Sequence, residues 1–419
     1  MTATQLSQAA LDIQAIYQSP EAVQNPYPLY ERARQHGEVV TVPEWNAVAV
    51  FGHEEVSAVL RSPAALSGQF VGQDDTGSPL PSETLKLLEP MMLFHNGPSH
   101  ARLRGLVNAA FTPRVVAEQE LLVRELTREL LAAAGPGRFD LIEGLATPLP
   151  VSVISRMLGL SGTDDGKFRR WTHSVAELLG GVNASPELSE QIESDAREMR
   201  DYFRDLASEL RAAPQPGLLS ALAAVSMPDE EGQDAQLSSD ELLANAVLLL
   251  VAGHETTSNL IGRGVLALSE QAGAWAELCA APELPASLAT NLADELLRFT
   301  SPVQLTGRVL GAPTDIGAQT FAAGTHTMLL LAAANRDPRT FAAPDQLDWQ
   351  RPNAARHLAF ASGPHYCLGA SLARLEARVV FGELARYPQL CVLEQAHEYR
   401  PNITLRGLTR LEVELGERG

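Results

Sequence analysis

Apolar and polar residues alternate with a helical period over most of the chain. The longest such stretch covers residues 100–211 almost throughout, and a group of proline and glycine residues at 214–217 interrupts it. Shorter stretches with the same period predict helices over residues 54–60, 218–225 and 370–386. The pattern therefore indicates a protein built mainly from α-helices.

Two regions have the pattern of strands instead. Residues 39–42 and 47–51 are rich in valine, and residues 43–46 between them predict a turn, so the three segments indicate a strand pair. After Arg308, residues 308–331 alternate with glycine turns and predict further short strands. We expect a mainly α fold with a small β-rich part. Because no clean linker interrupts the chain, we expect residues 1–419 to form a single catalytic domain.

One helix is predicted to be unusually long. Ser238 and Glu241 form a capping box that starts it, and its apolar pattern continues to about Leu268. Some 30 residues at 1.5 Å each give a length of roughly 45 Å, which exceeds the width of most domains. We therefore expect this helix to cross the middle of the molecule.

Two loops are predicted from polar composition. Residues 72–82 form a polar stretch with glycine and proline, and their length suits a lid better than a tight connection. Residues 226–236 carry an acidic cluster and predict a solvent-exposed loop before the long helix.

Composition excludes several classes of protein. The 419 residues carry a formal charge of −19, which is a poor match to a polyanion and excludes nucleic acid as the main partner. Three widely spaced cysteines cannot form a disulfide framework and fit a reducing, cytoplasmic location. Residues 1–18 do not have the pattern of a signal peptide. The longest apolar run, residues 246–253, is too short to span a membrane.

The densest chemical signal is the loop at residues 360–369, with the sequence FASGPHYCLG, directly before a predicted helix. A thiolate at Cys367 is favoured there by the helix dipole and by free backbone N–H groups. Gly363 and Gly369 allow backbone to approach closely on both sides of the sulfur. Such a thiolate suits either metal ligation or covalent chemistry.

This loop resembles the haem-binding loop of the cytochrome P-450 superfamily, the haem-thiolate monooxygenases. The resemblance implies the P-450 fold, with the long central helix crossing over a bound haem b. It makes Cys367 the axial iron ligand and places Phe360, His365 and Gly369 among the haem-binding residues. A thiolate ligand pushes electron density onto iron and favours cleavage of the O–O bond.

The long helix carries a second motif, Ala252-Gly253-His254-Glu255-Thr256-Thr257. Gly253 leaves room for a flat cofactor, and the Thr256 hydroxyl can bond the Ala252 carbonyl and loosen the helix. A zinc-protease pattern fails, because Ser258 stands where the second histidine belongs. The motif resembles the family's oxygen-activation motif, which implies that Glu255 and Thr256 deliver protons and that Ala252 and Gly253 lie against the haem.

Two further sets of residues follow the family's order along the chain. Glu295 and Arg298, three residues apart on a helix, together with Arg351, resemble a structural triad that braces the fold behind the cysteine loop. The family's clamp for the haem propionates is matched by His100, Arg104, Arg308 and His365. All four side chains could make charge-assisted hydrogen bonds to the two propionate carboxylates.

The resemblance implies a haem-dependent monooxygenase that acts on a small hydrophobic substrate. No Gly-x-Gly-x-x-Gly fingerprint is present, so electrons from NADH or NADPH are expected to arrive through a separate ferredoxin or flavodoxin with its reductase. Arg102, Arg356 and Arg374 are candidates for a basic docking face. The segments expected to line the substrate pocket are residues 63–93, 168–183, 247–252, 303–306 and 403–405.

Three alternatives stay open at this point. A peroxygenase of the same fold would use hydrogen peroxide, but such enzymes typically lack the acid–alcohol pair. A non-catalytic haem sensor or carrier would keep Cys367 and the propionate clamp without needing Glu255 and Thr256. A cysteine-nucleophile enzyme would need no haem at all.

Overall fold

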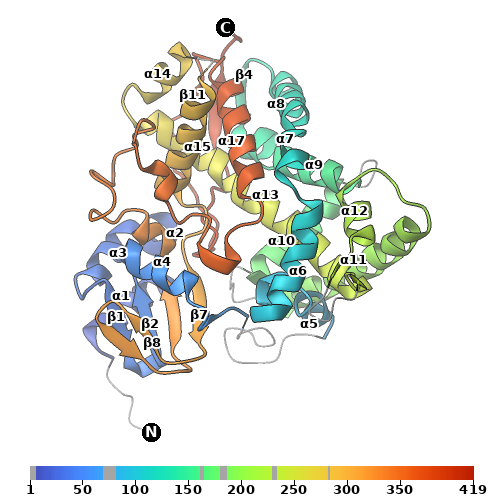
Figure 1. The fold of residues 1–419 in the computed structure, drawn as a ribbon. Helices are drawn as coiled ribbons and strands as arrows, with labels where there is room; N and C mark the ends of the chain where they lie inside the picture. The colour runs from blue at the N-terminus through green and yellow to red at the C-terminus, as the bar shows by residue number, and fades with distance from the viewer. Residues whose placement is uncertain (1–5, 69–81, 161–164, 180–185, 229–233, 282–283) are drawn as a thin grey trace.

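The computed structural model describes residues 6–68, 82–160, 165–179, 186–228, 234–281 and 284–419. Helices make up most of it (Figure 1). Those of eight residues or more are α1 (Gln8–Gln18), α3 (Tyr27–Arg34), α4 (His53–Arg61), α6 (Gly97–Ala110), α8 (Glu120–Ala134), α9 (Pro148–Leu158), α10 (Asp165–Leu179), α11 (Pro186–Ala212), α13 (Ser239–Glu270), α15 (Ala286–Thr300) and α17 (Ala370–Leu384). The shorter ones are α2 (Pro20–Gln24), α5 (Ser82–Leu88), α7 (Pro113–Ala117), α12 (Leu218–Ala224), α14 (Ala274–Ala280) and α16 (Leu331–Ala334).

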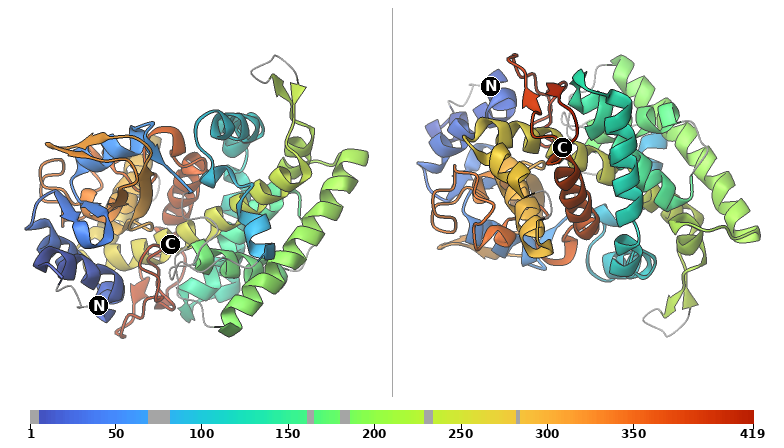
Figure 2. Two further views of the ribbon diagram at one scale, coloured as in Figure 1. Left: turned by 90° about the horizontal axis from the view of Figure 1, so that it is seen from below. Right: turned by 90° about the horizontal axis from the view of Figure 1, so that it is seen from above.

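The main sheet joins two segments that are far apart in the sequence. Its strands are ordered β1-β2-β10-β7-β3, where β1 is Val39–Val42, β2 is Ala47–Val50, β3 is Ala65–Leu66, β7 is Thr306–Leu310 and β10 is His326–Leu329. The predicted β1–β2 pair is antiparallel, and Asn46 closes its turn in the left-handed region at φ 47°. Strand β2 then pairs with β10 in parallel. The sheet lies to one side of the main group of helices (Figures 1 and 2).

The predicted long helix is α13, with 32 residues from Ser239 to Glu270. The capping box is present: the Ser238 hydroxyl accepts from the Glu241 N–H, and the Glu241 carboxylate accepts from the Ser238 N–H. Most residues between Leu242 and Leu268 are buried, and α13 crosses the middle of the molecule in all three ribbon views (Figures 1 and 2). It packs against α9, α10, α11, α15 and α17.

Two sequence predictions need correction. The long helical stretch contains a strand, β4 (Gly137–Asp140), which pairs with β12 (Glu412–Leu415) near the C-terminus. Strand β12 also pairs with β11 (Cys391–Val392). The predicted loop over residues 226–236 contains a strand pair, β5 (Met227–Pro228) and β6 (Asp234–Ala235). In both cases strand pairing with a distant or short partner leaves no periodic signal in sequence.

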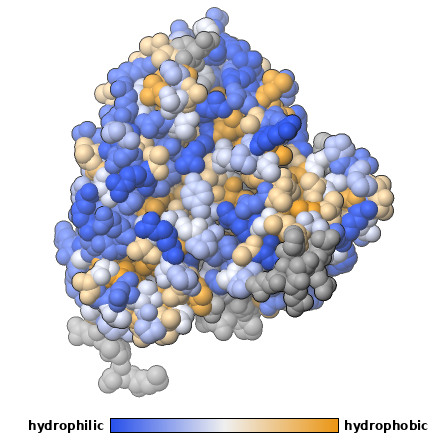
Figure 3. Space-filling model, in the orientation of Figure 1, coloured by the Kyte–Doolittle hydropathy of each residue, from blue (hydrophilic) through white to orange (hydrophobic). Residues whose placement is uncertain are grey.

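The remaining predictions about elements agree with the structure. The strands expected over residues 308–331 include a hairpin of β8 (Thr314–Ile316) and β9 (Gln319–Phe321). The proposed lid at residues 72–82 lies outside the described residues, except for Ser82, which begins α5. None of the helices in the described ranges is long and apolar enough to span a membrane. Hydrophilic side chains cover most of the face in Figure 3, with hydrophobic ones between them in small groups.

Candidate functional site: the cysteine loop and the middle of α13

The loop before α17 is folded back on itself around Cys367. The Cys367 N–H donates to the Phe360 carbonyl at 2.9 Å, and the Tyr366 N–H donates to the Gly363 carbonyl at 3.0 Å. The Cys367 side chain is half-buried, and Gly369, the residue before α17, donates its N–H to the sulfur. The loop thus presents one sulfur atom at the start of a 15-residue helix.

Two residues of this loop have left-handed backbone conformations. Gly363 has φ 72°, and a Cβ atom there would stand 2.4 Å from the Leu60 carbonyl oxygen of α4. Glycine is therefore required where the loop packs on α4. Ala361 has φ 58°, which is strained for a residue with a Cβ atom by about 1–2 kcal/mol. A glycine at this position would adopt the same conformation without that cost.

The environment of Cys367 favours the neutral thiol. Burial raises the pKa of Cys367, and the Gly369 N–H and the charges of Arg104 and Arg374 offset this only in part. The expected helix dipole is thus outweighed by desolvation. A metal ion deprotonates a coordinating thiol outright. The raised pKa argues against a free nucleophile.

Cationic and donor groups gather around His365, and no carboxylate of the described residues is bonded to them. The rings of His100 and His365 lie 4.1 Å apart, and burial together with His100, Arg308 and Arg104 lowers the pKa of His365 to about 3. Burial lowers the pKa of Arg308 to about 10, and its Nη1 donates to the Gly307 carbonyl and the Thr306 hydroxyl. Arg104 donates to the Tyr366 carbonyl at 2.6 Å. Within the described ranges no carboxylate pairs with either arginine, so the cluster fits an anionic group such as two propionates.

The middle of α13 opens to solvent although the helix is buried on both sides of that point. Ala252 is exposed and Gly253 and Thr256 are half-buried, whereas Val251 is buried. A Cβ atom at Gly253 would meet nothing closer than Ile154, at 3.9 Å. The Thr256 hydroxyl donates to the Ala252 carbonyl at 2.8 Å, as expected. An accessible, flat stretch of helix backbone of this kind leaves room for a planar group.

Glu255 has a partner that the sequence did not indicate. It is 5% exposed, and its Oε2 accepts from Nη1 of Arg400 at 2.5 Å. The two residues are 145 positions apart, and no motif or period connects them. The sequence places this half-buried arginine in the C-terminal segment and does not indicate its partner. The glutamate is thus held by an ion pair and does not extend freely to the protein surface.

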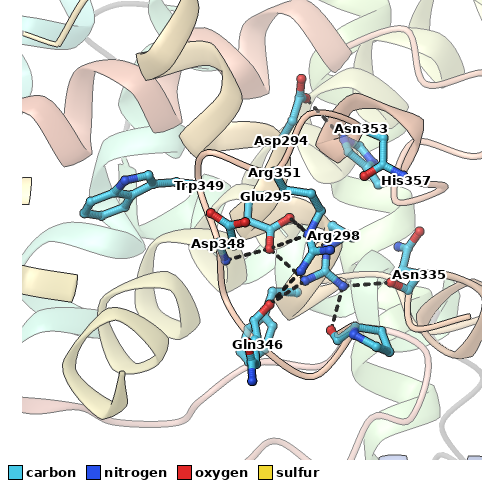
Figure 4. Close-up of polar contacts among 12 residues, drawn as sticks. Asp294, Glu295, Arg298, Asn335, Gln346, Asp348, Trp349, Arg351, Asn353 and His357 are labelled. Atoms are coloured by element: carbon cyan, nitrogen blue, oxygen red, sulfur yellow. Dashed lines mark hydrogen bonds and ion pairs between the residues drawn. The ribbon is translucent and has the colours of Figure 1, made fainter. Parts of the chain in front are cut away.

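The predicted structural triad is present and fully buried. Arg298 donates through Nε and Nη2 to both oxygens of Glu295 at 2.7 Å, and Arg351 donates through Nε to the same carboxylate at 3.1 Å (Figure 4). Both arginines also donate to the Gln346 carbonyl at 3.0 Å. The Asn335 side chain accepts from the Leu358 N–H at 2.6 Å, and Arg298 donates to the Asn335 carbonyl. The triad therefore ties α15 to the segment that leads into the cysteine loop.

Two of the three arginines proposed for a docking face are already paired. Arg102 bonds to Glu241, and Arg374 bonds to Asp294 at 2.6 Å. Arg374 also lies 4.7 Å from the centroid of the Phe360 ring and bonds the Tyr366 hydroxyl. Arg356 is exposed, and the described part of the chain offers it no paired carboxylate. Of the three arginines, Arg356 is therefore the one most available for contact with a redox partner.

Glu376 is a buried acid that sequence reasoning missed. It lies on α17, 2% exposed, and bonds Thr257 of α13. Burial raises the pKa of Glu376 to about 8, so the folded protein binds this proton more tightly than the unfolded chain does. We expect stability to fall as pH rises from the unfolded value near 4.5 through 8, by up to about 1.4 kcal/mol per pH unit.

Glu376→Gln should remove this dependence, because the amide is neutral at every pH. Urea unfolding at pH 6 and pH 8.5 measures it, with the exposed Glu118→Gln as control. Equal pH dependence of the parent and Glu376→Gln would contradict the prediction.

Taken together, these positions fit a haem. Cys367 offers the sulfur ligand, the cluster of His100, Arg104, Arg308 and His365 suits its carboxylates, and Ala252 and Gly253 leave space for its ring.

Comparisons with known proteins agree with this assessment. Residues 287–409 match the family model of cytochrome P450. The chain is 37% identical over 421 residues to the cytochrome P450 monooxygenase PikC of Streptomyces venezuelae, covering 98% of this chain and 95% of that protein. It is 36% identical over 403 residues to the vitamin D(3) 25-hydroxylase of Pseudonocardia autotrophica, covering 94% and 95%. The structure of CYP164A2 of Mycobacterium smegmatis matches with a TM-score of 0.83 and 38% identity over 97% of this chain and all of that one.

The helix-rich fold and these relatives place the chain in the class of haem-binding oxidoreductases. The chain belongs to the cytochrome P450 family and is a monooxygenase.

Proposed function

We propose that the enzyme inserts one atom of O2 into a small hydrophobic organic substrate held beside haem b. The reaction is RH + O2 + NAD(P)H + H⁺ → ROH + H2O + NAD(P)⁺, with the electrons supplied by a separate redox partner. One observation carries this proposal. The half-buried Cys367 sulfur belongs to a loop beside Arg104 and Arg308, and neither arginine is paired with a carboxylate among the described residues. A thiolate-ligated haem, when bound, supplies the activation of dioxygen.

The chain's own residues bind and orient this cofactor. We propose that Cys367 ligates the iron and that Gly369 donates its N–H to the sulfur, which tunes the ligand. Phe360 holds the Cys367 N–H through its carbonyl. The residues that would hold the propionates are His100, Arg104, Arg308 and His365. Ala252 and Gly253 would lie against the ring from α13.

Protons are proposed to reach the reacting oxygen through Thr256 and Glu255. Thr256 lies on the accessible part of α13, where its hydroxyl can hold a water molecule close to the ring. Glu255 is the acid nearest to it in sequence, and its carboxylate is held by Arg400. The pair supports a dioxygen-dependent enzyme over a peroxygenase or a haem sensor, neither of which needs an acid next to an alcohol.

Thr256→Ala should uncouple NAD(P)H consumption from product formation. Without the hydroxyl, protons arrive poorly, and we expect product per NAD(P)H to fall by about tenfold or more while hydrogen peroxide release rises. Thr290→Ala is the matched control, because Thr290 makes the same bond to the carbonyl four residues earlier, but at an exposed position on α15. The ratio of product to NAD(P)H measures the effect. An unchanged ratio in Thr256→Ala would remove this residue from the proton path.

The redox partner is proposed to be a ferredoxin or a flavodoxin with its reductase, and NADH or NADPH the electron source. Such carriers are usually acidic, so the exposed Arg356 is the best remaining candidate for a contact. Because the cysteines lie apart and free, we propose a cytoplasmic location, where thiols stay reduced.

The substrate is proposed to be small and hydrophobic. Two of the expected lining segments meet in the structure, since Val303 pairs with Leu405 and the Gln304 N–H donates to the Thr404 carbonyl at 2.8 Å. Relatives are named for polyketide and biotin biosynthesis and for hydroxylation of vitamin D(3). These names differ widely, and apolar pockets are the default, so the proposal stays at this class.

The test uses purified holoprotein with a surrogate ferredoxin, its reductase and NADPH. Hydrophobic compounds are first screened for a shift in the haem spectrum, and those that bind are then incubated under ¹⁸O2. We expect one ¹⁸O atom in the product. Product that forms with hydrogen peroxide but never with O2 and electrons would instead identify a peroxygenase, and binding without any turnover a sensor.

A further inference from the structure

One carboxylate of α15 holds residues on both sides of the cysteine loop. Oδ1 of Asp294 accepts from Arg374 Nε at 2.6 Å. The same oxygen lies 3.2 Å from Nε2 of His357 (Figure 4). Burial lowers the pKa of His357, and the Ala359 N–H donates to its Nδ1, so the one ring hydrogen lies on Nε2 and points to Asp294. His357 precedes the loop at residues 360–369 and Arg374 follows it on α17, so Asp294 ties both flanks of the loop to α15.

Arg374 contacts the cysteine loop at two points. Its Nη1 donates to the Tyr366 hydroxyl at 3.2 Å, and its guanidinium carbon lies 4.7 Å from the centroid of the Phe360 ring. The two aromatic rings meet edge to face, with their centroids 6.2 Å apart. Tyr366 directly precedes Cys367, and the Phe360 carbonyl accepts from the Cys367 N–H. One guanidinium group therefore touches two residues that position the backbone of Cys367.

The guanidinium group is also a permanent charge near the sulfur. Burial lowers the pKa of Arg374, but the Tyr366 hydroxyl and the Asp294 carboxylate raise it overall, so this side chain stays charged. Burial raises the pKa of the Cys367 thiol, and the charges of Arg104 and Arg374 act in the opposite direction. Asp294 bonds the Nε side of Arg374, whereas Nη1 bonds the loop, so the positive end of this ion pair faces the loop. The field of Arg374 therefore reaches the sulfur although its charge is paired.

We propose that Arg374 is a positioning residue that fixes the cysteine loop and holds a positive charge near the Cys367 sulfur, so that the haem-bound protein accepts its first electron more readily. The inference rests on the proposed function of Cys367 as the iron ligand. In this step one electron from the redox partner converts Fe(III) to Fe(II), and no bond breaks and no proton moves. The step adds one negative charge, which a nearby cation stabilises. This role differs from a docking contact, because the guanidinium group is turned inward to Asp294 and the loop.

Three substitutions separate the charge of Arg374 from its contacts. Arg374→Gln removes the charge, whereas Arg374→Lys keeps it but loses the planar group that bonds on two sides and stacks on a ring. Tyr366→Phe removes only the hydroxyl that Arg374 bonds. Arg378→Gln is the matched control, because Arg378 lies four residues further along α17 and pairs with Glu120 at 2.7 Å. The Arg378 side chain is 28% exposed, close to the 25% of Arg374.

The first measurement is the reduction potential of the substrate-free holoproteins, titrated against reference dyes. We expect the equilibrium constant for reduction to fall about tenfold in Arg374→Gln, which for one electron is about 59 mV toward more negative potential. Arg374→Lys should stay within about threefold of the parent, because the charge remains. Arg378→Gln should also stay within about threefold, since its cation is bonded to Glu120 and not to the cysteine loop. A tie that only joined α15 to α17 would not make the potential follow the charge at position 374.

The second measurement reports on the loop and needs neither a redox partner nor turnover. The proteins are reduced chemically and bound to carbon monoxide, and the loss of the thiolate band is followed as urea is added. Circular dichroism follows the unfolding of the helices in the same samples. We expect Arg374→Gln, Arg374→Lys and Tyr366→Phe to lose the band at lower urea than the parent, before their helices unfold. Arg378→Gln should lose the band only together with its helices, as the parent does.

Several results would overturn the proposal. These are a parent-like potential in Arg374→Gln, an equally low potential in Arg374→Lys, or a thiolate band that resists urea in Tyr366→Phe and Arg374→Lys as it does in the parent. If Arg374→Gln bound no haem, the urea series of Tyr366→Phe and Arg374→Lys would still decide. If the parent itself shows no thiolate band, the proposed function fails; if the parent shows the band and the Arg374 variants match it, only the role of Arg374 fails.

Discussion

Cys367→Ser is expected to abolish product formation and the spectral band that marks thiolate ligation when the reduced protein binds carbon monoxide. The loop geometry offers one sulfur, fixed by the Phe360 carbonyl and the Gly369 N–H. A serine hydroxyl at the same place is a far weaker ligand and donates little electron density to iron. The loss should exceed the 10–100-fold that removal of an outer-shell partner typically costs.

The two other cysteines provide the controls. Cys391 is exposed and Cys279 is half-buried, and both are free. Cys391→Ser and Cys279→Ser should keep the band and the activity, measured by difference spectroscopy and product yield. If Cys367→Ser kept the thiolate band, or if either control lost it, the assignment of the iron ligand would be wrong.

Glu295→Gln is expected to have the largest effect on stability. Its carboxylate is fully buried and neutralises Arg298 and Arg351, which are themselves 0% and 4% exposed. The change leaves two buried guanidinium groups without a counter-charge, and breaking a buried ion pair typically costs about 3–5 kcal/mol. That is a large share of the roughly 5–15 kcal/mol that stabilises a typical domain.

The same variant should also bind haem poorly. The triad is connected through Asn335 to the Leu358 N–H, two residues before the cysteine loop begins. Denaturant unfolding and the haem-to-protein ratio after purification measure both effects. Glu277→Gln, an exposed glutamate on α14, should change stability by no more than about 0.5 kcal/mol. A variant Glu295→Gln as stable as this control would show that the triad is dispensable.

Patterns in the local sequence predicted those parts of the protein whose cause is local. The capping box at Ser238 starts α13 because both partners lie within one helical turn. The Glu295–Arg298 pair forms because three residues separate two positions on one helix face. The valine-rich strands β1 and β2 pair across a short turn. In each case the interacting groups are neighbours along the chain.

Contacts between distant segments were decided only by the tertiary structure. Glu255 meets Arg400 across 145 positions, and β4 meets β12 across more than 270. The raised pKa values of Cys367 and Glu376 come from burial, which depends on everything that packs around them. A sequence pattern specifies which groups are present and how adjacent ones are spaced. Which charge is neutralised, and by which residue, depends on which distant segments the fold brings into contact.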